Sequence, residues 1–317
     1  MGKGNAAVKQ WMSNKARFAD LFNGIIFRGE QVVQPSDLEM ISGESDILIS
    51  DKRNKSKEIQ RYRDITMKWK DRGRLTILAC ENQSKVHYAM PVRNMLYDSL
   101  AYTEQIKQLW DEVSSKEKGL AQEEFLSHFR KEDRIVPVIT LVFYYDVKKW
   151  DGNIDLYEMF GLREKKALLQ KYIPNYYINL VDAGNMENID CFRTDLQEIF
   201  GMLQCRNKKE QLLEYMKKNE NYFRNVDQET YYALREFLHS ERLLKKEVKM
   251  KNVEERIDMC KALEDLYNDG VENGEESGCA RVNHLNSLLA EKNRVSDIIK
   301  AANDKEFQRK LFEEFSL

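Results

Sequence analysis

The chain has 317 residues, of which 42% are hydrophobic and 33% are charged, with 51 basic and 53 acidic side chains. This apolar share is large enough for a packed core, so a disordered, collagen-like or low-complexity chain is excluded. The formal net charge of −2 argues against a protein that coats nucleic acid through bulk charge, although a local basic groove is compatible with it.

The sequence also bears on membranes and metal centres. No apolar run reaches the roughly 18 residues of a transmembrane helix, and the N-terminus lacks the apolar stretch of a signal peptide. The five cysteines form no C-x-x-C pair and the four histidines are scattered, which argues against disulfides and zinc. We therefore expect a cytoplasmic protein with no membrane partner.

The first two-thirds of the chain mix helix and strand patterns. A helix is predicted from Ala7 to Phe22, and a second begins near Pro91, a residue favoured in a first helical turn. β-branched and aromatic runs predict five strands: Asp46–Ser50, Arg61–Lys70, Leu75–Gln83, Arg134–Tyr145 and Tyr176–Asp182. The fourth is apolar almost throughout, which indicates burial on both faces. This order predicts an α/β fold with a mixed sheet flanked by helices.

The remaining third is predicted to be helical. Four amphipathic segments indicate helices: Asp190–Cys205, Lys208–Tyr222, Asp227–Lys246 and Val253–Tyr267. The stretch Asp269–Gly278 contains three glycines and predicts a break, either an exposed turn or a hinge, before a last helical stretch from Arg281. We therefore expect two regions, residues 1–200 with the sheet and residues 201–317 without strands.

The second and third predicted strands meet at a turn around Arg72 and Gly73. If these two residues form the turn, Asp64 lies directly opposite Glu81, with Cβ atoms about 4.5–5.5 Å apart. Gln83 faces the same side as Glu81 because side chains alternate along a strand. A three-residue loop is the alternative, and it shifts the pairing by one residue.

Two opposed carboxylates repel each other unless a cation lies between them. Oxygen ligands at this spacing suit Mg²⁺ or Mn²⁺, so Asp64, Glu81 and Gln83 are candidate site residues. The alternative interpretation is that Asp64 and Glu81 are ordinary solvated charges. Against this alternative, Glu81 and Gln83 follow the apolar run Leu75–Cys80 at the end of a strand that looks buried.

The segment from Asp51 to Arg74 holds ten basic and four acidic residues, a local balance of +6. A metal-dependent phosphodiesterase needs cations for the phosphates beside carboxylates for the metal. Arg61, Arg63 and Lys68 belong to this basic strip and are candidate DNA contacts. The alternative is a soluble sheet edge guarded against aggregation by Lys and Arg.

Five segments of the chain resemble the recombination-promoting nuclease and putative transposase family of the PD-(D/E)xK superfamily. They are Phe18–Phe22, Arg61–Ile65, Ala79–Ser84, Met90–Tyr97 and Pro137–Tyr145. The resemblance covers roughly residues 7–200 and is most specific between Glu81 and Tyr97. It implies a restriction-endonuclease-like core of α-β-β-β-α-β order that cleaves DNA with Mg²⁺ or Mn²⁺ and water.

By this resemblance, Asp64 is the central metal-binding carboxylate and Glu81 is the second ligand. Asp20, on the first helix, matches an acidic position that binds or orients the metal. Arg93 and Tyr97 are four residues apart on one helix face, and are expected to contact phosphate or to brace the site.

Two residues depart from the family motif. Arg63 precedes Asp64 where the motif has proline, and Gln83 occupies the position of the motif's lysine. The second departure matters more, because glutamine cannot supply a positive charge. Another cation must help, and Lys68 and Lys85 are candidates. Lys85 is also a candidate DNA contact.

The sequence thus favours a metal-dependent DNA endonuclease that promotes recombination or mobile-element activity. One alternative is a weakly active or inactive nuclease-fold module that binds DNA or a protein partner. A further alternative is an interaction protein that forms homo-oligomers through its helical C-terminal region.

Overall fold

The computed structural model describes residues 3–41, 44–50, 56–62, 64–71, 74–114, 121–161, 168, 170–238 and 256–317. The chain divides into two compact units, Met1–Ile257 and Asp258–Leu317. In the described part of the chain, no helix combines the length and hydropathy needed to span a membrane.

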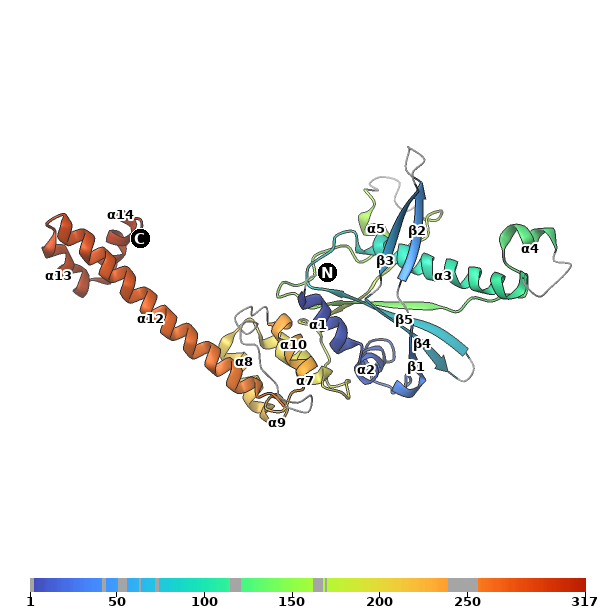
Figure 1. Ribbon diagram of the computed structural model, residues 1–317, viewed down its shortest axis with the longest axis horizontal. Coiled ribbons are helices and arrows are strands. Elements are labelled where there is room, and N and C mark those ends of the chain that lie inside the picture. The colour runs from blue at the N-terminus through green and yellow to red at the C-terminus, as the bar shows by residue number, and fades with distance from the viewer. Residues whose placement is uncertain are drawn as a thin grey trace. The chain divides into compact units, whose positions relative to one another are not determined.

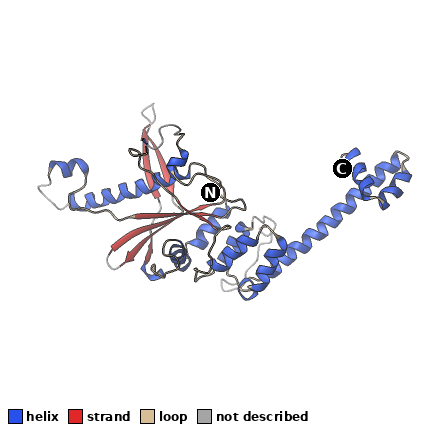
Figure 2. Cartoon of the chain, turned by 180° about the vertical axis from the view of Figure 1, so that it is seen from behind, coloured by secondary structure: helices blue, strands red, loops and turns tan. Residues whose placement is uncertain are grey.

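The first unit is built on a mixed five-stranded sheet in the order β1-β4-β5-β6-β7. Figure 2 shows the strands in red. Its strands are β1 (Leu38–Met40), β4 (Ile65–Asp71), β5 (Arg74–Gln83), β6 (Val138–Tyr144) and β7 (Asn179–Asp182). β1, β4 and β5 pair antiparallel, whereas β5, β6 and β7 run parallel to one another. The last five residues of β6 are buried, as its apolar sequence predicts for a central parallel strand.

The pairing of β4 with β5 confirms the register predicted from a two-residue turn. Asp71 pairs with Arg74 at one end of the ladder, and Ile65 pairs with Cys80 at the other. Asp64, the residue before β4, therefore comes opposite Glu81.

The strands before β4 differ from the predicted ones. The predicted strand Arg61–Lys70 is in fact two strands, because β3 (Ser56–Tyr62) ends before Asp64 and β4 begins after it. β3 pairs with β2 (Glu44–Ser50) in a two-stranded sheet of its own, so the predicted strand Asp46–Ser50 lies outside the main sheet. β1 takes the edge position instead, and its three residues are too short to show an alternating pattern.

The single helix predicted from Ala7 to Phe22 is also two helices, α1 (Lys3–Met12) and α2 (Lys15–Ile25). The break occurs because Asn14 caps α2. Its side-chain oxygen accepts a hydrogen bond of 2.9 Å from the backbone N–H of Ala16.

Helices cover both faces of the sheet (Figure 1). On one face, Met90 at the start of α3 (Met90–Ser114) packs with Val142 and Tyr144 of β6. On the other face, Phe143 and Tyr145 contact the ring of Phe237 in α10 (Gln228–Phe237).

Helices of the first unit continue beyond the predicted boundary at residue 200. The unit also contains α4 (Gln122–Ser127), α5 (Leu156–Met159), α7 (Leu196–Cys205), which crosses this boundary, and α8 (Lys209–Lys218) and α9 (Glu220–Phe223), which follow it. Trp11 of α1 packs edge-on against Phe237 of α10 at 5.4 Å between ring centroids. The helices after residue 200 therefore help to build the core of the first unit, and the division into a domain of residues 1–200 and a helical region of residues 201–317 stays a prediction.

The second unit contains α12 (Met259–Glu291), α13 (Val295–Asn303) and α14 (Lys305–Glu314), which enclose a core of Leu285, Leu289, Ala301 and Leu311. The break predicted at Asp269–Gly278 is wrong, since α12 runs through it. A glycine costs a helix only about 1 kcal/mol, and no proline interrupts the segment.

A buried arginine ties the N-terminal helices to the later ones. Arg17 of α2 donates to Asp195 at 2.8 Å and to Thr230 at 2.9 Å, and lies 3.3 Å from Asp227. We expect Arg17→Ala to lower the free energy of unfolding by about 3 kcal/mol in urea titrations, because it leaves the buried Thr230 hydroxyl and the Asp195 carboxylate, which is only 15% exposed, without their cation. Arg224→Ala, which removes an exposed ion pair, should change it by less than about 1 kcal/mol. Equal effects would contradict the structural role of Arg17.

Candidate metal and nucleic-acid site

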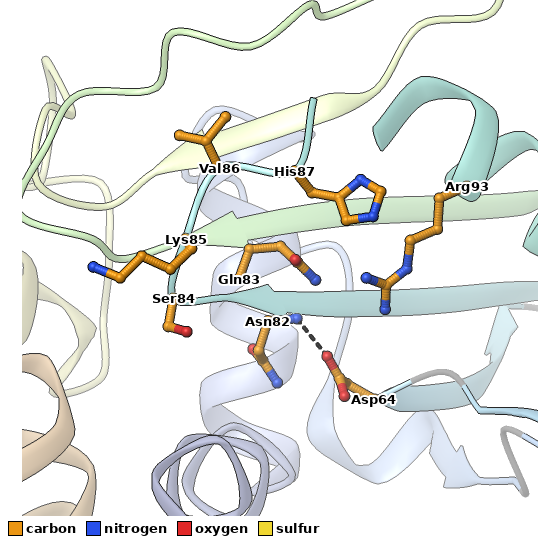
Figure 3. A pocket seen from close by; sticks show the side chains of 8 residues that line it. All are labelled: Asp64, Asn82, Gln83, Ser84, Lys85, Val86, His87 and Arg93. Carbon is orange, nitrogen blue, oxygen red and sulfur yellow. Dashed lines mark hydrogen bonds between the residues drawn. The ribbon is translucent and has the colours of Figure 1, made fainter. Parts of the chain in front are cut away.

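A pocket of about 270 Å³ opens at the carboxyl end of β5. The residues that line it are Asp64, Asn82, Gln83, Ser84, Lys85, Val86, His87 and Arg93 (Figure 3). The pocket lies where the antiparallel and parallel halves of the sheet meet, since β5 pairs with β4 on one side and β6 on the other. Carboxyl ends of parallel strands are a frequent location of binding sites in α/β folds.

Asp64 is buried, with 6% of its surface exposed. Its Oδ2 accepts a hydrogen bond of 2.8 Å from the backbone N–H of Asn82, as Figure 3 shows. Burial raises the pKa of Asp64 above its usual value, while the Asn82 N–H and the charges of Arg93 and Lys9 oppose this change. The backbone of β5 thus orients a carboxylate whose charge is costly to bury.

Glu81 is fully buried in β5 and pairs with Val142 of β6. Arg93 Nη2 lies 3.4 Å from Glu81 Oε2, and the Arg93 side chain is 31% exposed. The arginine therefore contributes a positive charge to the carboxylates from the solvent side of the pocket.

Arg93 and Tyr97 lie one turn apart on α3, as their spacing predicts. The Arg93 guanidinium carbon lies 5.4 Å from the centroid of the Tyr97 ring. Tyr97 is buried and is not among the residues lining the pocket, whereas Arg93 is. Of the two roles expected for Tyr97, this geometry supports bracing.

Gln83 and Lys85 reach the pocket from the end of β5 and the residues that follow it. Gln83 is nearly buried. Lys85 Nζ lies 3.1 Å and 3.0 Å from the two carboxylate oxygens of Asp146, and its side chain is 74% exposed. Asp146 also accepts a hydrogen bond from the backbone N–H of Val147.

Asp20 lies in a different environment. Its Oδ2 accepts hydrogen bonds from the backbone N–H groups of Arg193 and Thr194, at 2.8 Å and 2.7 Å, and from the Thr194 hydroxyl. It does not line the pocket. Across the described ranges, no three His, Cys, Asp or Glu side chains gather as they would around a metal ion. The structure therefore places Asp20 outside the pocket that Asp64 lines, and shows Asp20 anchoring the turn before α7.

The basic residues expected to contact DNA have different positions. Lys68 pairs with Ile77 within the β4–β5 ladder, four residues from Asp64, and does not line the pocket. The Arg61 side chain and all of Arg63 fall outside the described residues. Their roles as DNA contacts stay predictions.

Four pocket residues were not predicted as site residues: Asn82, Ser84, Val86 and His87. The chief one is Asn82, because its backbone N–H holds Asp64. The sequence could have indicated them only by their position, because they lie beside or just after Glu81 and Gln83. The backbone N–H of Asn82 does not depend on residue type, so only the strand pairing shows that it donates to Asp64.

The chemistry of these donors fits a small divalent cation. Mg²⁺ is usually bound by one or two protein carboxylates, with water and substrate phosphates as the other ligands. Asp64, just before β4, is a buried carboxylate that lines the pocket. Glu81 of β5 is a second buried carboxylate, which does not line the pocket but contacts Arg93, which does.

The pKa of Asp64 leads to a prediction about stability. A carboxyl group whose pKa is raised on folding favours the native state when protonated, and this contribution is lost as the pH rises through the folded-state pKa. We expect Asp64→Asn to have a higher Tm than the wild type at pH 7, because the amide is neutral and its oxygen can still accept the Asn82 N–H. The gain should shrink as the pH falls toward 4. Thermal melts across this range check it, and a lower Tm at pH 7 would contradict it.

Comparison with known protein families identifies the chain. A family model described as "Putative transposase, YhgA-like" matches residues 4–234, which include every residue that lines the pocket. Comparison with curated proteins and with solved structures finds no match. The family match covers most of the chain and agrees with the resemblance seen in the sequence. The chain therefore belongs to the YhgA-like family of putative transposases.

Proposed function

We propose that the chain is a DNA endonuclease that depends on Mg²⁺ or Mn²⁺ and hydrolyses phosphodiester bonds. One observation carries the proposal: Asp64, just before β4, and Glu81 of β5 are both buried, Asp64 and Arg93 line the same open pocket, and Arg93 lies 3.4 Å from Glu81. Buried carboxylates are costly, and titratable groups with perturbed pKa values in a pocket are typical of functional sites.

Asp64 and Glu81 would hold the metal ion. The ion would lower the pKa of a bound water and offset the negative charge that develops on the phosphate. The Asn82 N–H keeps one oxygen of Asp64 fixed in orientation, which limits the reorganisation needed for binding. Gln83 offers an amide that can donate to and accept from the water or the phosphate without adding charge.

The order of elements supports a restriction-endonuclease-like core within this proposal. α2, β1, β4, β5, α3 and β6 follow one another as α-β-β-β-α-β, with the β2–β3 hairpin inserted between β1 and β4. The family name points the same way, because moving a DNA element requires that DNA strands be cut. DNA is therefore the partner that we propose.

Gln83 favours a second candidate, in which the fold binds DNA or a protein partner with little or no cleavage. A site without the motif's lysine has lost one source of positive charge for the transition state. The two candidates differ in metal binding, since a cleaving site needs a divalent ion and a binding module does not.

Plasmid nicking tests the proposed activity. With Mg²⁺ or Mn²⁺ present, we expect the wild type to nick supercoiled DNA and Asp64→Asn or Glu81→Gln to be slower by roughly a hundredfold or more. Each substitution keeps the side-chain size while removing a charged metal ligand. Equal rates in all three proteins would contradict the assignment of the site.

Metal binding gives a test that is independent of cleavage. We expect Mn²⁺ at about 100 times its Kd to stabilise the wild type by about 2.7 kcal/mol, seen as a rise in Tm. Asp64→Asn should show little of this rise because it lacks the charged ligand. DNA binding by the wild type without any response to metal would instead support the binding module.

A further inference from the structure

Gln83 cannot supply a positive charge to the site. Among the residues that line the described pocket, two basic side chains are able to supply it, Lys85 and Arg93. The assignment of this role to one of them rests on the proposed endonuclease function. The two side chains differ in the direction in which they point and in the groups that they contact.

Lys85 is directed away from the carboxylates. Its Nζ is paired with both oxygens of Asp146, at 3.1 Å and 3.0 Å, and most of its side chain is exposed. Figure 3 shows it pointing to the opposite side from Asp64. A lysine held in this way contributes charge to the rim of the pocket, but not to the position between the two carboxylates.

Arg93 is directed toward them. In Figure 3 its guanidinium extends from α3 toward Asp64, and Nη2 lies 3.4 Å from Glu81 Oε2. The charge of Arg93 also acts on Asp64. The Tyr97 ring lies beneath the guanidinium and limits its movement.

The contact with Glu81 is long for a charge-assisted hydrogen bond, which is usually about 2.7–2.9 Å. It engages one of the five N–H donors of a guanidinium. The planar fork of arginine matches phosphate oxygens in pairs, which a lysine ammonium does not. Arg93 is thus placed both to offset the charge of Glu81 and to reach a phosphate that enters the pocket.

We propose that Arg93 is the catalytic cation of this site. It has the role that the family motif gives to a lysine at the position of Gln83. It neutralises Glu81 when the pocket lacks a divalent ion, and it competes with that ion for the carboxylate. It contacts the scissile phosphate when DNA is bound. Metal affinity and cleavage rate should therefore respond to its removal in opposite directions.

The test uses the full chain with Arg93→Gln, Arg93→Lys and Lys85→Gln, and with Arg224→Gln as the matched control. Arg224 also pairs with a glutamate, Glu220, but lies outside the pocket. Titration calorimetry measures Mn²⁺ affinity without DNA, and plasmid nicking at saturating Mn²⁺ measures the rate. Thermal melts report whether each variant folds.

We expect Arg93→Gln to bind Mn²⁺ roughly fivefold more tightly, because the competing charge is gone. Its nicking rate should fall roughly a hundredfold, the usual effect of losing one group that stabilises transition-state charge. Arg93→Lys keeps the charge without the fork and should lie between Arg93→Gln and the wild type in both measurements, so it carries the test if Arg93→Gln does not fold. Arg224→Gln should match the wild type.

Three results would overturn the inference. Wild-type Mn²⁺ affinity and nicking in Arg93→Gln would remove any role for Arg93, while the proposed endonuclease would stand. A larger loss of nicking in Lys85→Gln than in Arg93→Gln would assign the cation to Lys85. A wild type that neither binds Mn²⁺ nor nicks DNA would refute the proposed function, and the role of Arg93 with it.

Discussion

The burial of two carboxylates side by side constrains the rest of this fold. Asp64 lies just before β4 and Glu81 lies in β5, where the antiparallel register brings them opposite each other, with 6% and 0% of their surfaces exposed. Charges in such positions lose hydration and repel each other, so the surrounding structure must offset a considerable free-energy cost. The Asn82 N–H of β5 and the Arg93 guanidinium of α3 offset part of this free-energy cost.

The pocket lies at β5, where the sheet changes from antiparallel to parallel strand pairing. Antiparallel pairing with β4 places Asp64 opposite Glu81, while parallel pairing with β6 places the ends of both strands at the same edge. The helical part of the unit supports this edge. Arg206, which caps α7, donates to the backbone oxygens of Tyr145 and Phe237 at 2.7 Å and 2.9 Å and also to that of Asp146. Asp146 in turn holds Lys85, so residues beyond position 200 shape the rim of the site.

Local patterns were sufficient to predict the strand register at the candidate site and insufficient to predict some of the fold. The opposition of Asp64 and Glu81 was predictable because strand side chains alternate and a two-residue turn sets the register. The β1 edge strand was missed because three residues carry no periodicity. The bend at Asp64 and the separate β2–β3 sheet were missed because they depend on pairing partners elsewhere in the chain. The continuity of α12 was missed because glycine weakens a helix without forbidding it.

The sequence by itself determined the mixed α/β class, the β4–β5 register, the carboxylate pair and the placement of Arg93 one turn before Tyr97. These features follow from spacing within short segments, where backbone geometry alone decides which side chains share a face. Only the tertiary structure decided that Asp20 anchors the turn at Arg193 and Thr194, that Lys85 pairs with Asp146, and that Arg93 reaches Glu81. Except for Arg93, which lies twelve positions from Glu81, these contacts join residues tens to hundreds of positions apart. They depend on how helices and strands pack, which residue spacing does not encode.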